Sequence, residues 1–274
     1  MTVPASTPRS RFTRLVSMPE PEIDLARAAL LVAAEEYPQL VPDLYLRRLD
    51  LLAERVRDRL ADEVAALVVL QEMSRVLFEE ESFRGNAEAY YDPRNSFLND
   101  VLDRRLGIPL TLSIVFLEVG WRLGLPLEGV NFPGHFLIRH RGEAMSLLLD
   151  PFQKGELCFE DQAQELLDRV YGGSVALRPD YLRPADRRDI LVRLLANLKN
   201  IYMNSGDEVR AISVVERILL VRPAVEERRD RGMLLARVGR VDEAVTDLRQ
   251  YLDASPDAPD AKRVRLLLEQ LGGD

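Results

Sequence analysis

Three polar residues in the middle of the chain have the types and the settings that acyl-transfer chemistry needs. Ser113 lies in the first turns of an apolar, helix-forming run, His135 follows a Pro-Gly pair, and Asp150 precedes a proline. A nucleophile near a helix N-terminus gains from the helix dipole. An imidazole facing it can act as a base, and a carboxylate can fix the tautomer of that imidazole. The candidate catalytic residues are therefore Ser113 as nucleophile, His135 as base and Asp150 as the group that orients the imidazole.

The elements that must position these candidates are one buried helix and a small sheet. The run 109–123 is apolar nearly all round, which is typical of a helix inside a domain. Three strands separated by turn residues follow it, at 127–132, 135–140 and 145–150. A helix followed by an antiparallel meander is an α+β pattern, and adjacent strands can place His135 beside Asp150. His140 falls on the opposite strand face from His135 and is expected to face solvent.

The chain on either side of this core is predicted to be helical. Apolar residues recur at three-to-four spacing over 21–82, which indicates an N-terminal helical bundle. Residues 1–20 are rich in Ser, Thr and Pro and indicate a disordered lead-in. The core then occupies 83–180, and a second helical region occupies 187–274.

The C-terminal region contains an internal repeat. Gly206, Ala211 and Pro223 recur 33 residues later as Gly239, Ala244 and Pro256. This period, with Gly at the hairpin, Ala in the second helix and Pro after it, is the signature of TPR-type helix pairs. Because two repeats are few, we expect them to pack on the core or on a final helix over 261–271.

Three stretches of the core carry a resemblance to a known family. They are Gly-Ile-Pro-Leu-Thr-Leu-Ser at 107–113, Gly-Val-Asn-Phe-Pro-Gly-His-Phe-Leu-Ile-Arg at 129–139, and Leu-Asp-Pro-Phe at 149–152 with Gly155. In these stretches the chain resembles the transglutaminase-like superfamily, which has a papain-like core. Within that superfamily it is similar to the bacterial SirB family, which joins this core to a C-terminal TPR region. The resemblance covers nearly the whole chain, from Ile23 through the repeats.

The resemblance implies a Cys-His-Asp triad in active members of the superfamily. His135 and Asp150 match the second and third members, whereas Ser113 stands where the cysteine would sit. A serine hydroxyl stays protonated and needs simultaneous proton removal and a well-placed oxyanion hole, whereas a thiol and an imidazole readily form an ion pair. Cys-type transglutamination or proteolysis is therefore not expected. The one cysteine, Cys158, follows the third strand and is a poor substitute for the missing thiol.

Two functions from different classes remain open. The first is a non-catalytic binding or scaffold protein, a pseudoenzyme that docks a protein or peptide partner through its TPR-like tail. The second is a Ser-His-Asp-dependent hydrolase or acyltransferase that acts on an amide or ester.

Composition excludes several other classes. With 45 acidic and 37 basic residues the net charge is -8, which disfavours nucleic acid as a partner. No apolar run reaches the length of a membrane span, and no secretory signal opens the chain. A single cysteine allows no internal disulfide and is typical of a cytoplasmic protein. Two histidines and one cysteine lack zinc-ligand spacing, and Gly172-Gly173 lacks the context of a phosphate loop, so neither metal nor cofactor is expected.

Overall fold

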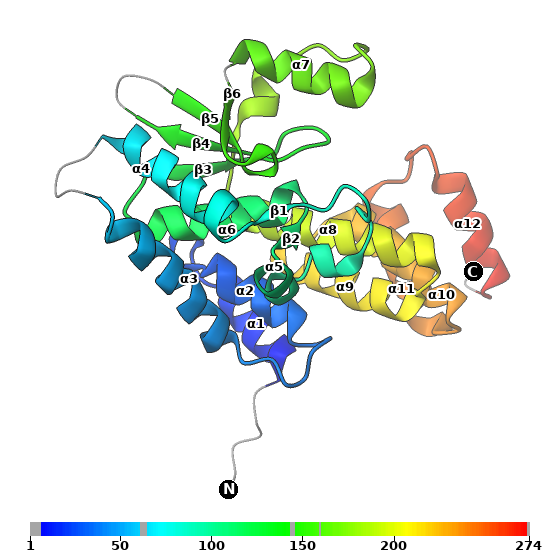
Figure 1. Ribbon diagram of the computed structural model, residues 1–274. Coiled ribbons are helices and arrows are strands. Elements are labelled where there is room, and N and C mark those ends of the chain that lie inside the picture. The colour runs from blue at the N-terminus through cyan, green and yellow to red at the C-terminus, as the bar shows by residue number, and fades with distance from the viewer. Residues whose placement is uncertain (1–6, 61–64, 143–145, 159, 273–274) are drawn as a thin grey trace, which may run out of the picture. The chain divides into compact units, whose positions relative to one another are not determined.

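The computed structural model describes residues 7–60, 65–142, 146–158 and 160–272. The chain divides into two compact units, Met1–Ile190 and Leu191–Asp274. The first unit combines helices with a small antiparallel sheet, and the second is helical throughout its described residues (Figure 1). The predicted α+β class with a helical C-terminal region is confirmed.

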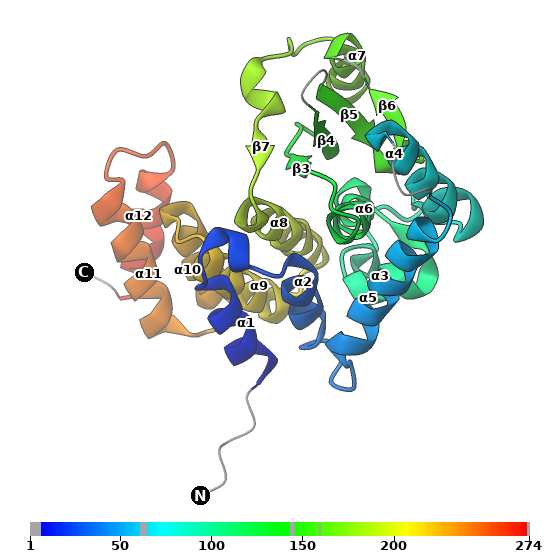
Figure 2. The same cartoon turned by 90° about the vertical axis from the view of Figure 1, so that its left-hand side faces the viewer.

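The sheet of the first unit has five strands in the order β6-β5-β4-β3-β7, and every neighbouring pair is antiparallel. Their bounds are β3 Leu127–Val130, β4 Leu137–Arg141, β5 Ser146–Asp150, β6 Glu156–Cys158 and β7 Pro184–Ala185. Helix α6 (Pro109–Arg122) lies on one side of the sheet and helix α7 (Glu160–Tyr171) on the other (Figure 2). The predicted buried helix and meander are therefore present, with two further short strands.

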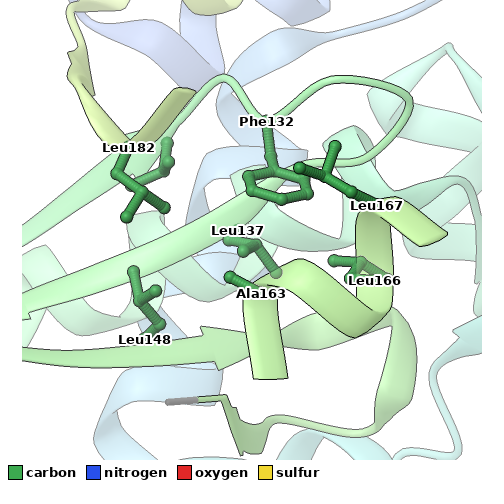
Figure 3. Packing of buried hydrophobic residues seen from close by; sticks show 8 residues of the cluster. Phe132, Leu137, Leu148, Ala163, Leu166, Leu167 and Leu182 are labelled. Atoms are coloured by element: carbon green, nitrogen blue, oxygen red, sulfur yellow. The ribbon is translucent and has the colours of Figure 1, made fainter. Parts of the chain in front are cut away.

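Successive side chains of each strand point to opposite faces of the sheet, and apolar residues pack into a core on both faces. Leu137 and Leu148 point to the α7 side, where they pack with Phe132, Leu182 and three residues of α7 (Figure 3). The intervening residues Ile138 and His140 point to the other face, because successive side chains alternate. Helix α6 covers that face, so His140 is only 6% exposed, and the prediction that it faces solvent is wrong. Burial lowers the pKa of His140.

The N-terminal helices surround α6 and share its core. They are α2 Leu25–Ala33, α3 Pro42–Arg57 and α4 Ala66–Ser74, which continues as a π-helix over Arg75–Glu80. Eight of the nine residues of α2 are buried, as an apolar helix inside a domain should be. Helix α5 (Leu98–Arg104) and two short parallel strands, β1 Arg84–Gly85 and β2 Leu106–Gly107, connect these helices to α6. The helical segment and the core thus form one compact unit.

Part of the expected disordered lead-in is instead ordered helix. Helix α1 spans Pro8–Val16, and the Thr7 side chain caps it by accepting a hydrogen bond from the backbone N–H of Ser10 at 3.1 Å. Phe12 and Val16 lie one turn apart and are both buried. The polar composition concealed this helix because it buries only a narrow apolar stripe. Residues 1–6 lie outside the described part of the chain.

Replacing Val16 with alanine should therefore destabilise the protein. We expect the free energy of unfolding to fall by about 2 kcal/mol, because the change removes buried methyl groups and leaves a cavity. Denaturant titration followed by circular dichroism measures this loss. Arg14→Ala, at an exposed position of the same helix, should change stability by less than about 0.5 kcal/mol. Equal, small effects of both variants would mean that α1 does not pack on the rest of the first unit.

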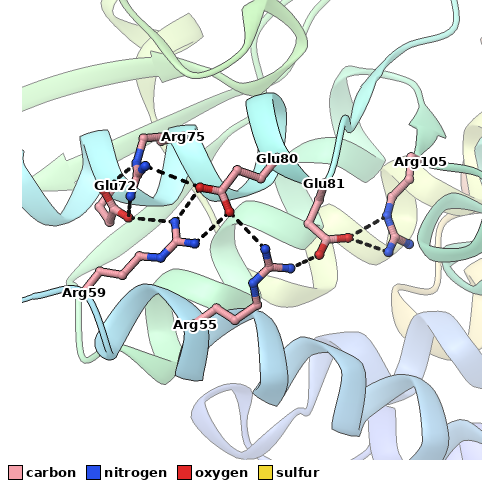
Figure 4. A network of polar contacts seen from close by, with 7 residues as sticks. All are labelled: Arg55, Arg59, Glu72, Arg75, Glu80, Glu81 and Arg105. Carbon is pink, nitrogen blue, oxygen red and sulfur yellow. Dashed lines mark hydrogen bonds and ion pairs between the residues drawn. The ribbon is translucent and has the colours of Figure 1, made fainter.

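An alternating chain of arginines and glutamates joins α3, α4 and the π-helix (Figure 4). Arg59 contacts both Glu72 and Glu80, Arg55 contacts Glu80 and Glu81, and Glu81 also accepts from Arg105 at 2.6 Å. The hydrogen bonds from Arg59 lower the pKa of Glu80 from 4.5 to about 2. Because these groups lie at the surface, half-buried or exposed, each pair contributes little alone, and the network contributes chiefly to the geometry of the helix ends.

This network should make stability depend on acid pH. The pKa of Glu80 is lower in the folded protein than its ordinary value of 4.5, so its contribution is present above about pH 4.5 and is lost as the pH falls toward 2. Glu80→Gln should flatten the fall in melting temperature over that window. Glu88→Gln, at an exposed glutamate outside the network, serves as the control. An unchanged profile in Glu80→Gln would show that the network does not persist in solution.

The second unit consists of successive antiparallel helices. Helix α8 (Arg187–Ser205) contains the boundary between the units, and α9 Glu208–Val221, α10 Val225–Arg237, α11 Val241–Ala254 and α12 Ala261–Gln270 follow. Gly206 and Gly239 have φ of 72° and 77°, the left-handed conformation that favours glycine in a tight hairpin. Ala211 and Ala244 are fully buried in the second helix of each pair. The repeat of 33 residues therefore corresponds to two helix pairs.

Among the described residues, no helix combines the length and the apolar character that crossing a membrane would require.

Candidate functional site

A buried histidine and aspartate form the centre of the candidate site. His135 Nε2 lies 2.8 Å from Asp150 Oδ2, and the two residues are 8% and 5% exposed. The other oxygen of Asp150 accepts hydrogen bonds from the backbone N–H groups of Phe152 at 2.9 Å and Gln153 at 3.3 Å. The carboxylate therefore both orients the imidazole and caps the turn that follows β5.

The loop before β4 holds the imidazole in place. The backbone N–H of His135 bonds to Phe132 O at 3.1 Å, across a turn in which Gly134 has φ of 69°. A Cβ on Gly134 would lie 2.6 Å from the side chain of Val170, so this position needs glycine both for its conformation and for its space. The Nε2 atom of the imidazole faces Asp150, which fixes the orientation of the ring. The sequence predicted that His135 opens the strand, whereas β4 begins two residues later, at Leu137, and His135 lies in the turn before it.

Ser113 occupies a different environment. It is the fifth residue of α6 and is 0% exposed, and its Oγ has no hydrogen-bond partner within the described residues. A buried hydroxyl without a partner costs free energy, and it is not activated by a base. Residues four apart share a helix face, so the residue at the helix start on the face of Ser113 is Pro109. Pro109 carries neither a nucleophile nor a backbone N–H.

The start of α6 is held by side chains that sequence reasoning missed. Thr111 Oγ1 accepts from the backbone N–H of Ile108 at 3.1 Å and donates to Asn95 O at 2.7 Å. Asn95 is fully buried, and its Nδ2 donates to Ala89 O and Tyr90 O. This tethers the loop 86–95 to the N-terminus of α6. The sequence at 90–93, Tyr-Tyr-Asp-Pro, is typical of a turn but does not indicate that Asn95 is buried.

Phe152 completes the wall beside the imidazole. Its ring meets that of His135 edge to face, with centroids 5.9 Å apart. On its other side the strand β1 approaches so closely that a Cβ on Gly85 would lie 2.2 Å from the Phe152 ring. Phe152 and Gly85 therefore position His135 through packing.

The His135–Asp150 pair can hold a proton between two buried side chains. Within the described residues, no group of three or more His, Cys, Asp or Glu side chains is placed to bind a metal ion. Cys158 ends β6 opposite Leu148, and its side chain lies outside the described part of the structure. A pocket of about 160 Å³ adjoins Asp150, but it is lined largely by acidic and amide side chains such as Glu156 and Glu165.

Comparison with known proteins supports both halves of this architecture. Residues 43–196 match the model of the transglutaminase-like superfamily, and residues 198–269 match that of the tetratricopeptide repeat. A UPF0162 protein of Xylella fastidiosa is 36% identical over 270 residues, which cover 96% of this chain and 95% of that protein. The UPF0162 protein of Pseudomonas aeruginosa is 36% identical over 199 residues, covering 73% of this chain and 72% of that protein.

A shorter stretch of the chain is also similar to a human protein. Human F-box only protein 21 is 44% identical over 84 residues, which cover 31% of this chain and 13% of that protein. No solved structure matches this chain significantly. The match to the superfamily model, together with relatives of nearly equal length, establishes that this chain is a member of the UPF0162 family whose core belongs to the transglutaminase-like superfamily.

Proposed function

We propose that this protein is a non-catalytic binding protein, with a transglutaminase-like core that lacks a working nucleophile and a TPR region that docks a protein or peptide partner. The observation that carries the proposal is the setting of Ser113. Its hydroxyl is fully buried, has no partner within the described residues and lies one turn inside a helix that begins with Pro109. A catalytic serine needs a base within hydrogen-bond reach and access to substrate.

The repeat region supports a role in protein interaction. Stacked helix pairs of the TPR type form extended surfaces, and each repeat contacts only its neighbours. The two pairs here account for most of the second unit. A partner bound there would need no chemistry from the core.

One observation favours a second candidate, a Ser-His-Asp-dependent hydrolase or acyltransferase that acts on an amide or ester. The His135–Asp150 hydrogen bond of 2.8 Å is the pair that would orient a general base. In that reaction the Ser113 hydroxyl would attack the acyl carbon while His135 takes its proton, and backbone N–H groups at the start of α6 would hold the oxyanion. The bond from the acyl carbon to the amine or alcohol would then break, with His135 giving the proton to that leaving group, and water or another acceptor would release the acyl group from Ser113.

A labelling and turnover experiment separates the two candidates. We expect the purified protein to resist a fluorophosphonate probe at Ser113 and to show no ester or amide turnover that Ser113→Ala removes. Ser96→Ala is a matched control, because Ser96 is also buried and its Oγ also lacks a partner within the described residues. Turnover lost in Ser113→Ala and kept in Ser96→Ala would overturn the non-catalytic assignment in favour of the hydrolase.

Several finer assignments belong to the same proposal. We place the protein in the SirB family, in the cytoplasm, with a protein or peptide as partner and with neither nucleic acid nor cofactor bound. The functional division of the chain is an N-terminal helical segment at 21–82, a core at 83–180 and a TPR-like region at 187–274. The support for these assignments is the motif resemblance, the acidic net charge of -8 and the position of the repeats.

A further inference from the structure

A groove in the second unit has the dimensions of a ligand site. It lies between α10 and α12 and has a volume of about 450 Å³. Its apolar lining consists of Met233, Ala236, Leu266, Leu267 and Leu271. Leu266 is 55% exposed, whereas Met233, Leu267 and Leu271 pack on the buried cluster of Leu248, Tyr251, Val264 and Leu268. The floor of the groove is therefore anchored to the core of the unit.

Helix α12 thus presents two apolar faces. Ala261, Val264 and Leu268 point into the core, as a terminal capping helix requires. Leu266 and Leu267 line the groove, where Leu267 also packs on the core and Leu266 is 55% exposed. An exposed apolar surface of this kind marks a site where a partner can dock.

The remaining lining of the groove is basic and polar. Arg237 from α10, Arg263 from α12 and Gln270 complete it, and no acidic residue is among its lining residues. Neither arginine forms an ion pair within the described residues, and both are exposed. Elsewhere in this unit Arg229, Arg231 and Arg240 are each paired with a carboxylate. The groove therefore combines an apolar surface with two arginines that form no ion pair within the described residues. This local positive charge contrasts with the net charge of the chain, which is -8.

The other hollows of comparable size lack this combination. The pocket between α3 and α5 is lined by Arg48, Arg55 and Arg105, but these pair with Asp103, Glu80 and Glu81. In the pocket beside β4, Arg183 pairs with Asp180, and Arg139 donates to the carbonyl of Leu182. Arg178 in that pocket stacks on Tyr181 and donates to its hydroxyl, and Asp180 gives the lining an acidic residue. Arg237 and Arg263 are exposed and are placed to pair with charges from outside the chain.

We propose that the α10–α12 groove binds an acidic segment of a partner protein, with large apolar side chains of that segment seated on Met233, Leu266 and Leu267 and its carboxylates paired with Arg237 and Arg263. Arginine suits this role because its planar guanidinium pairs with a carboxylate through two parallel hydrogen bonds. This proposal rests on the proposed function and names the chemistry of the partner and the place where it docks.

Fluorescence anisotropy with short labelled peptides on the full chain tests the groove. The probe is a peptide of alternating glutamate and leucine pairs, and its matched copies replace every glutamate with lysine or every leucine with serine. We expect the glutamate–leucine peptide to bind and both copies to bind at least about tenfold more weakly. Replacing both Arg237 and Arg263 with glutamine should weaken binding by about tenfold or more and should reduce its dependence on salt. Leu266→Ser should weaken it several-fold.

Matched variants outside the groove keep the test specific. Arg240→Gln removes an arginine that pairs with Glu243, and Leu220→Ser removes an exposed leucine of α9. Both should leave peptide affinity unchanged. Failure of the peptide to bind, equal binding of the lysine copy, or unchanged affinity in the double variant would overturn the groove as the docking site. None of these results involves turnover at Ser113, so they are distinguishable from failure of the non-catalytic assignment.

Discussion

Replacing Glu118 with alanine is expected to lower the free energy of unfolding by about 3–5 kcal/mol, because it breaks a buried ion pair that also caps a helix. Glu118 is 5% exposed, and its Oε1 accepts from the backbone N–H of Ala26 in the first turn of α2 at 2.9 Å. Its other oxygen pairs with Arg122, whose Nε in turn contacts Asp50 of α3 at 2.8 Å. One carboxylate therefore joins α2, α3 and α6.

One control variant separates the charge of Glu118 from its function as a helix cap. Glu118→Gln keeps an acceptor for Ala26 and should cost less than half as much as Glu118→Ala. Burial raises the pKa of Glu118 above its ordinary value of 4.5, so the stability that the carboxyl contributes is complete below about pH 4.5 and declines as the pH rises through the folded pKa. The cost of Glu118→Gln should therefore shrink between pH 4.5 and 7.

Chemical denaturation over that pH range measures these differences. Glu88→Ala, at an exposed glutamate, should lie within about 0.5 kcal/mol of the parent protein. A loss below about 1 kcal/mol for Glu118→Ala would show that the N-terminal helices do not depend on this residue and that the first unit is less integrated than its contacts indicate.

The elements that the sequence predicted best are those whose periodicity reflects burial directly. The continuous apolar run at 109–123 could be stable only inside a domain, and α6 is there. The 33-residue repeat of Gly, Ala and Pro required two helix pairs because each of those residues has a specific conformational or packing function. The Pro-Gly-His-Phe and Leu-Asp-Pro-Phe stretches similarly predicted that a histidine and an aspartate would meet, and they form a hydrogen bond.

What the sequence did not predict depends on contacts between distant segments. His140 is buried because α6 covers the face of the sheet that alternation alone left open. Helix α1 is stable because Phe12 and Val16 find partners, which a polar composition cannot indicate. Asn95 is buried because the loop 86–95 folds back on the start of α6, and the burial of Ser113 depends on how fully its neighbours enclose α6. In each case a segment distant in sequence buries the residue. The periodicity of apolar residues indicates that a helix or strand has an apolar face, but it does not indicate which segment packs on that face.

A serine-to-cysteine change at position 113 should produce a thiol that reacts very slowly. On a Cys158→Ser background, we expect Ser113→Cys to be alkylated by iodoacetamide at least about 100-fold more slowly than an exposed thiol, because only the accessible thiolate reacts and burial raises a thiol pKa. Ser205→Cys on the same background is the matched control, since Ser205 is exposed at the end of α8. Denaturant should abolish the difference between the two variants.

The pH profile of that reaction decides between the two proposed functions. A rate at position 113 that stays low below about pH 8 would mean that His135 does not act on this position, and the search for function should then concentrate on the partner of the TPR region. Fast alkylation below about pH 7 that is lost when His135 is also replaced with alanine would instead reveal a base next to an accessible residue 113. That result would favour the serine hydrolase proposal, since a base that lowers a thiol pKa can also remove the proton of a hydroxyl during attack.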